Sequence, residues 1–129
     1  MAHFSQHSLQ QLNTLDPDLQ RILKEAIKIR DFSIICGYRS KEDQEKAFNE
    51  GNSRKHYPHS KHNTLPSVAV DIAPWPIDWH NKARFIFLAG IIYCIAKRLG
   101  IKIRYGGSWE GWEFKKQTLY DYGHFELIK

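Results

Sequence analysis

Cysteine is scarce in this chain of 129 residues, which holds only Cys36 and Cys94. Both stand among apolar neighbours, and their wide separation is unlike the short paired spacing of a cysteine-based zinc site. The scarcity excludes a disulfide framework, and we expect two buried free thiols instead. Because 42% of the residues are hydrophobic, a chain of this length can bury a stable core without cross-links.

The sequence also lacks a membrane-spanning segment and the pattern of an export signal. The longest uncharged apolar run, residues 85–96, is too short to cross a bilayer. Residues 1–11 are polar and have no apolar run behind a basic start. We therefore expect no signal peptide, no stable membrane insertion, and synthesis in the cytoplasm. A substrate outside the membrane would then be reached only after another agent releases the protein.

Acidic residues are fewer than basic ones. The chain has 14 Asp and Glu against 19 Lys and Arg, which gives a formal net charge of +5. Such a charge favours polyanionic partners, either nucleic acid or the phosphate-rich bacterial envelope. The basic residues are scattered along the chain, and neither a nucleic-acid-reading helix nor a zinc-finger spacing accompanies them. We expect no nucleic-acid partner, although charge alone does not choose between the two.

The chain has no internal repeat or linker, so we expect one domain over residues 1–129. Ser8 is predicted to open a short helix as part of a capping box, and Asp16 followed by Pro17 to open a second. Helix 81–99 is apolar nearly all round and should be the buried central helix. The remaining patterns predict a helix over 40–50, a polar loop over 52–67, and strands over 32–38, 68–72, 101–105 and 123–128. This order indicates an α+β fold: a small antiparallel sheet with flanking helices.

Three polar residues stand at the ends of these apolar elements. His62 lies in the long loop, Asp71 within the strand 68–72 and His124 within the last strand. A carboxylate among Val, Ala and Ile needs a partner, because burying a lone charge is very costly. Two imidazoles and a carboxylate are a usual ligand set of catalytic zinc. Their wide separation along the chain is no local signature, and an Asp71–lysine pair with surface histidines explains the pattern equally well.

Four short motifs follow one another in a specific order along the chain. They are GYRS at 37–40, SKH at 60–62, AVD at 69–71 and DYGH at 121–124. This order resembles the D-Ala-D-Ala carboxypeptidase/L-alanyl-D-glutamate peptidase family of zinc metallopeptidases, and its phage endolysins in particular. The resemblance spans about residues 32–127 and implies a Hedgehog/DD-peptidase-like fold. The chain departs from the commoner family pattern in one place, where residues 63–67 lengthen the turn between His62 and Asp71.

The resemblance also implies roles for individual residues. His62, Asp71 and His124 would bind Zn²⁺, and Asp121 matches the family's catalytic acid/base carboxylate. Arg39 matches a catalytic, substrate-facing arginine that holds a substrate carboxylate or a developing oxyanion. The alternatives are a turn residue at Asp121 and a surface salt bridge at Arg39.

Other side chains near the motifs are candidates for lesser roles. Gln44 and Ser60 are predicted on the substrate-binding side, Gln44 as a substrate contact and Ser60 as support for a ligand; each is as readily structural. His59 is the main rival metal ligand and His56 a weaker one. The aromatic segments at 75–79 and 109–112 either line a groove or pack over the sheet.

The function implied by this resemblance is that of a bacteriophage endolysin for host lysis. It would be a zinc-dependent peptidase that hydrolyses the L-alanyl-D-glutamate bond of the peptidoglycan stem peptide, using a metal-activated water and a carboxylate acid/base. The alternatives are a D,D- or L,D-carboxypeptidase or dipeptidase on the same fold, and a catalytically silent zinc-binding cell-wall module; retention of Asp121 argues against the last. We expect a monomer, made in the host cytoplasm, that acts on the cell wall after release.

Overall fold

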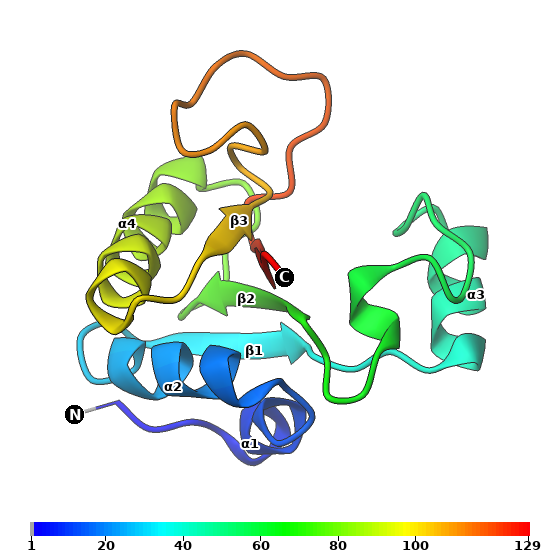
Figure 1. Cartoon of the computed structure of the whole chain (residues 1–129), viewed down its shortest axis with the longest axis horizontal. Coiled ribbons are helices and arrows are strands. Elements are labelled where there is room, and N and C mark those ends of the chain that lie inside the picture. Colours follow the sequence, from blue (N-terminus) through cyan, green and yellow to red (C-terminus); the bar gives the residue numbers. More distant parts are fainter. Residues whose placement is uncertain (1) are drawn as a thin grey trace.

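The structure is a computed structural model that describes residues 2–129 (Figure 1). Its elements follow the chain as helices α1 to α4, a short 3-10 helix η1 and strands β1 to β4. Their bounds are α1 Gln6–Leu12, α2 Pro17–Ala26, β1 Phe32–Cys36, α3 Lys41–Asn49, η1 Lys61–Asn63, β2 Ala69–Pro74, α4 Lys82–Leu99, β3 Ile103–Tyr105 and β4 His124–Leu127.

The four strands form one antiparallel sheet in the order β1-β2-β4-β3. This arrangement confirms the predicted α+β fold with a small antiparallel sheet. The register pairs Asp71 of β2 with His124 of β4, and Cys36 of β1 with Asp71 after a shift in the ladder. Residues that lie far apart in the sequence are thereby brought side by side at the centre of the sheet.

One face of the sheet carries the core and the other carries the polar residues. Val70 and Ile72 of β2 join the hydrophobic core together with Phe125 and Leu127 of β4. Because successive side chains of a strand point to opposite faces, the intervening Asp71, His124 and Glu126 share the other face. Helices α2 and α4 pack against each other, α4 also contacts β2 and β3, and α1 lies along β1. Figure 1 shows α3 set apart from these helices, beyond the end of β1.

The first helix begins earlier than the sequence predicted. Ser5, not Ser8, is the N-cap of α1, and its side chain accepts a hydrogen bond from the Ser8 N–H. Ser8 lies inside the helix and is buried, and its Oγ accepts a 2.9 Å hydrogen bond from the Ile34 N–H of β1. Its hydroxyl therefore joins the helix to the sheet, a contact that the local sequence does not reveal.

Helix α4 is buried on one face only, which corrects the expectation of a central helix. Phe87 is 63% exposed and Ile86 38% exposed, because only one side of α4 meets the core. Cys94 lies on the exposed side and Cys36 is half-buried, so the prediction of two buried thiols was wrong. Among the described residues, no helix combines the length and the apolar character needed to cross a membrane.

Candidate metal centre

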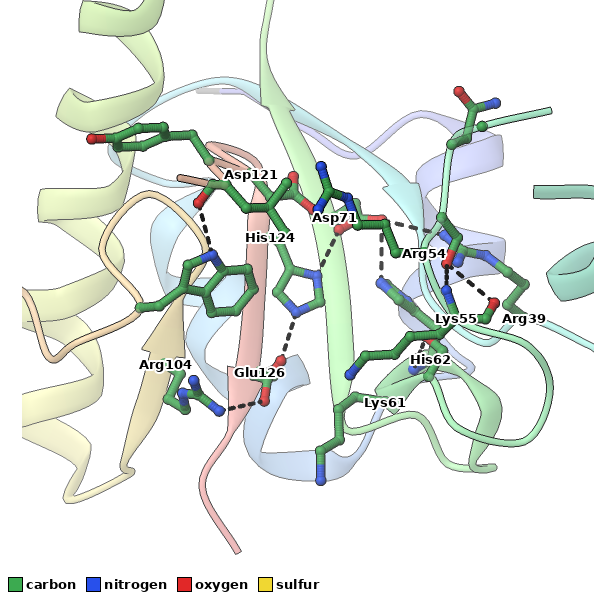
Figure 2. A pocket seen from close by; sticks show the side chains of 17 residues that line it. Arg39, Arg54, Lys55, Lys61, His62, Asp71, Arg104, Asp121, His124 and Glu126 are labelled. Atoms are coloured by element: carbon green, nitrogen blue, oxygen red, sulfur yellow. Dashed lines mark hydrogen bonds and ion pairs between the residues drawn. The ribbon is translucent and has the colours of Figure 1, made fainter. Parts of the chain in front are cut away.

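Asp71 lies at the centre of a cluster formed by β2, β4 and η1. The Nε2 atom of His62 is 3.2 Å from Oδ2 of Asp71, and the Nδ1 atom of His124 is 3.0 Å from Oδ1. Figure 2 shows the two imidazoles approaching the carboxylate from different elements. The structure thus places the three predicted ligands together, with one ring nitrogen directed at each carboxylate oxygen.

The outer nitrogen of each imidazole is held by a second acceptor. Nδ1 of His62 donates to the Gly37 carbonyl at 2.8 Å, and Nε2 of His124 donates to Oε1 of Glu126 at 2.8 Å. A ring nitrogen that donates in this way fixes the tautomer of the neutral imidazole and leaves the lone pair on the other nitrogen. When the rings are neutral, as a metal ion requires, the lone pairs therefore lie on His62 Nε2 and His124 Nδ1, both on the side of Asp71.

Local backbone structure sets the position of each histidine. His62 lies in η1, whose N-cap Ser60 accepts a 3.2 Å hydrogen bond from the His62 N–H. His124 directly follows Gly123, where an added Cβ would lie 2.4 Å from the Ile72 carbonyl oxygen. Glycine at this position therefore lets β4 approach β2 closely, and the Ile72 N–H donates to the Gly123 carbonyl at 2.9 Å.

Charge coupling shifts the protonation of all three residues. Burial alone would lower the pKa of His62, but the Asp71 carboxylate outweighs it and raises this pKa to about 10. Burial likewise opposes a rise at His124, where hydrogen bonds to Asp71 and Glu126 raise the pKa to about 9. Although burial disfavours its charge, the two histidines hold the pKa of Asp71 well below its usual range. In the metal-free site, two imidazolium rings therefore neutralise the carboxylates.

The donor chemistry of this cluster suits a divalent metal ion. Two groups of residues share Asp71 and could each hold a metal ion, because the ligand atoms within a group lie within 4.8 Å of one another. One group is Cys36, His62 and Asp71, and the other is Asp71, Asp121 and His124. The rings of His62 and His124 are 5.3 Å apart between centroids. Imidazole nitrogen and carboxylate oxygen are the ligand types of catalytic zinc. A cation between the two imidazoles would replace their protons as the partner of Asp71.

Asp121 belongs to the same cluster and lies on the loop that leads into β4. Its side chain lines a cavity of about 710 Å³ whose other lining residues include His62, Asp71 and His124. Desolvation in this cavity and the negative charge of Asp71 raise the pKa of Asp121 above its usual value. A carboxyl group with a raised pKa exchanges protons more readily near neutral pH.

Arg39 and Asp121 lie on opposite sides of Asp71 (Figure 2), and Gln44 holds the Arg39 guanidinium by a hydrogen bond. Its Nη2 is 3.6 Å from Asp71 Oδ2, and its Nη1 donates to Gln44 Oε1 at 3.0 Å. Gln44 is fully buried, so the structure offers it no substrate contact of the kind predicted. Its amide instead binds four protein groups: it accepts also from Asn63 Nδ2 and donates to Ser53 Oγ and the Lys55 carbonyl.

The rival histidines lie outside both groups of possible metal ligands. His59 is exposed and belongs to neither group. His56 is exposed as well, and its Nδ1 lies 2.7 Å from Oε2 of Glu45. Ser60 lines the cavity, and its Oγ accepts a hydrogen bond from the His62 N–H; its role as support for a ligand stays a prediction.

Two residues of the site were missed in the sequence. Glu126 is buried behind His124 and forms a 3.7 Å ion pair with Arg104. The sequence feature that could have predicted Glu126 is the alternation of side chains along a strand, which places residues 124 and 126 on the same face. Cys36 Sγ is 3.9 Å from His62 Nδ1, a contact that depends on the register shift between β1 and β2. Of the aromatic segments, Trp109 lines the cavity while Trp112 stacks on the buried Tyr105.

The chain is similar to proteins of one activity. It matches the family model described as phage L-alanyl-D-glutamate peptidase over residues 1–128. It is 33% identical over 135 residues to the L-alanyl-D-glutamate peptidase of Escherichia phage T5, a match that covers 97% of each chain. Its fold is similar to the crystal structure of the L-Ala D-Glu endopeptidase ChiX of Serratia marcescens. The TM-score is 0.78 and the identity 27%, over 98% of this chain and 90% of that one.

Proposed function

The chain belongs to the phage L-alanyl-D-glutamate peptidase family, and on that premise we propose that it is a zinc-dependent endopeptidase that cuts L-alanyl-D-glutamate bonds in bacterial peptidoglycan. The family assignment confirms the resemblance found in the motifs. The observation that carries the proposal is the pair of imidazoles whose nitrogens, Nε2 of His62 and Nδ1 of His124, converge on the two oxygens of Asp71.

His62, Asp71 and His124 are the proposed zinc ligands. The Gly37 carbonyl and Glu126 hold the two rings from behind and so orient toward Asp71 the nitrogens that would bind a cation. A zinc ion held there would supply Lewis-acid polarisation of the scissile carbonyl and an acidified water. The protein contributes the orientation of the ligands and a cavity large enough for a peptide segment.

Asp121 is the proposed general base and acid. Its raised pKa and its place beside Asp71 and His124 suit a group that takes a proton from the attacking water. The same carboxyl group would then protonate the departing amine of the glutamyl residue, so the proton is returned within one turnover. Arg39, fixed by Gln44 and open to the cavity, would stabilise the negative charge that develops on the carbonyl oxygen.

We further propose that the protein acts as a monomer on the host cell wall, after release from the cytoplasm in which it is made. The phage T5 relative and the net positive charge support a role at the anionic envelope. Light scattering of the purified protein checks the monomer, which a dimeric mass would contradict.

Digestion of purified peptidoglycan tests the proposed reaction. We expect new N-terminal D-glutamate in mass analysis of the products, and its loss when a chelator is added. Release of D-alanine without new D-glutamate termini would indicate a carboxypeptidase instead. Binding to peptidoglycan without any new terminus would indicate a catalytically silent module.

A further inference from the structure

Three basic side chains on one wall of the cavity have no acidic partner. Arg54, Lys55 and Lys61, here called the cationic wall, line the cavity that holds the candidate metal centre. Within residues 2–129, none of the three lies within 4.0 Å of a carboxylate. The other two cavity-lining cations do have partners, since Arg39 pairs with Asp71 and Arg104 with Glu126. Figure 2 shows Arg54 and Lys55 beside the Asp71 cluster and the side chain of Lys61 extending away from Asp71.

The backbone that carries the cationic wall is fixed to the metal centre. The buried Gln44 donates to the Lys55 carbonyl at 2.7 Å and accepts from Arg39 Nη1 at 3.0 Å. It also accepts from Asn63 Nδ2 at 3.1 Å, which ties the short helix that contains Lys61 to the same amide. One buried side chain therefore holds Arg39, the Arg54–Lys55 segment and η1 in a common arrangement, so the backbone that carries these cations has a set position relative to Asp71.

Two carboxylates of the same cavity already have cationic partners, so the charge of the wall is available to a substrate. Asp71 pairs with Arg39 and the two histidines, and Glu126 pairs with His124 and Arg104. A glutamyl residue has two carboxyl groups, and when one continues the peptide the other remains a free carboxylate. In the proposed reaction this residue lies on the leaving-group side of the scissile bond. The substrate therefore brings a negative charge into a cavity with three unpaired cations.

We propose that the cationic wall binds the free carboxylate of the glutamyl residue and so selects peptides that carry it. This inference rests on the proposed function and adds a specificity determinant to it. The wall lysines and arginine contact the substrate away from the reacting atoms, so they act on the recognition of the substrate and leave proton transfer to Asp121. Salt weakens such exposed charge pairs, and the preference should shrink as ionic strength rises.

The test uses two soluble peptides that contain the L-alanyl-D-glutamate bond. One has the free glutamyl carboxylate, and the other has a neutral carboxamide in its place. The variant Arg54→Gln/Lys55→Gln/Lys61→Gln is compared with the full-length zinc-loaded parent. A second triple variant, Arg98→Gln/Lys102→Gln/Lys116→Gln, removes the same charge from exposed positions outside the cavity.

We expect the parent to favour the carboxylate peptide in kcat/KM by roughly tenfold or more. The wall variant should lose this preference by slowing on the carboxylate peptide alone, and the control variant should keep it. Equal rates of the parent on both peptides, or a preference that survives in the wall variant, would overturn the inference while leaving the proposed function intact. A wall variant that loses only its binding to whole cell walls would also overturn it, by assigning the cations to envelope phosphates. Hydrolysis of neither peptide by the parent would contradict both proposals.

Discussion

At the scale of single residues, the candidate metal centre depends on how Asp71 is neutralised. Without a metal, both facing imidazoles are protonated, and the pKa values of His62 and His124 lie at about 10 and about 9. Metal binding requires neutral imidazole, so the ion and the protons compete for the same nitrogens. The same geometry therefore accounts both for a stable metal-free site and for a site that binds metal more tightly as the pH rises.

The metal-free protein should lose stability as the pH rises through the raised pKa values. The pKa of an ordinary histidine is 6.5, so the contribution of His62 is fully present below about pH 6.5 and disappears as the pH passes about 10. Urea unfolding in chelator at several pH values measures this loss. The His62→Asn variant is the control, because its stability should change less over that range. A parent protein whose stability stays constant or rises would contradict the charge assignment.

Replacing Asp121 by Asn should abolish turnover while leaving zinc bound. Loss of a general acid and base typically slows a reaction by about 10²- to 10⁴-fold. Metal content per chain and hydrolysis of the soluble carboxylate peptide are measured on the same sample. Normal turnover by the zinc-loaded variant would show that Asp121 is a turn residue only.

Replacing Glu126 by Ala should weaken zinc binding by about 10- to 100-fold, the usual effect of losing a group that orients a metal-binding histidine. The Glu126→Gln variant should recover part of the affinity, because its amide oxygen still accepts from His124 Nε2. Zinc affinity is measured by competition with a chelating dye, with Glu113→Ala on the exposed loop as the control. Equal affinity in the Glu126→Ala and Glu113→Ala variants would exclude the orienting role.

At the scale of elements, the close approach of β4 to β2 depends on Gly123. An added methyl group would lie 2.4 Å from the Ile72 carbonyl oxygen, so Gly123→Ala must push the strands apart beside His124. We expect a loss of about 1–3 kcal/mol in the free energy of unfolding, together with weaker zinc binding. Gly90→Ala in helix α4 is the matched control, since nothing lies within 4 Å of its added Cβ. It should be neutral or stabilising. Equal stability of the two variants in denaturant unfolding would contradict the packing argument.

Element boundaries were predictable where a local cap or breaker marks them. Asp16 caps α2 as the sequence predicted. Ser40 caps α3 at the start of the predicted helix 40–50, and Gly100 ends α4 in the left-handed conformation. The predicted start of α1 was wrong because Ser5 and Ser8 are both possible caps. Ser8 is instead buried by its contact with β1. Short apolar motifs do not determine strand order or register, so the contact between Cys36 and His62 could not be predicted from the sequence.

The candidate site was predictable in its residue types and less so in its connections. Asp71 was recognisable in the sequence as a charged residue within an apolar strand. The family resemblance carried by the motifs indicated His62 and His124 as its partners. Gln44 was misplaced because sequence alone does not distinguish a polar side chain that faces a cavity from one that is buried beneath it. The Gly37 carbonyl that fixes His62 is a backbone group, and any residue type would supply one.

At the scale of the whole molecule, the elements that form the hydrophobic core are different from the segments that line the candidate site. Helices α1, α2 and α4 supply the apolar packing around the sheet, while the segment after α3, η1 and the loop before β4 line the cavity at its polar face. Figure 1 shows α3 at the opposite side of the sheet from α4. The lining of the cavity comes from segments that are far apart in the chain, residues 39–62 and 104–126, together with Asp71 of β2.

Titration of zinc into the metal-free enzyme tests the central claim most directly. The apoenzyme is prepared by chelation, and hydrolysis of the carboxylate peptide is followed as zinc is added, alongside the His124→Ala variant. The account predicts no hydrolysis without metal, recovery that levels off near one zinc per chain, and no recovery in the variant. Full hydrolysis by the metal-free protein, with new N-terminal D-glutamate in its products, would contradict a metal centre at His62, Asp71 and His124.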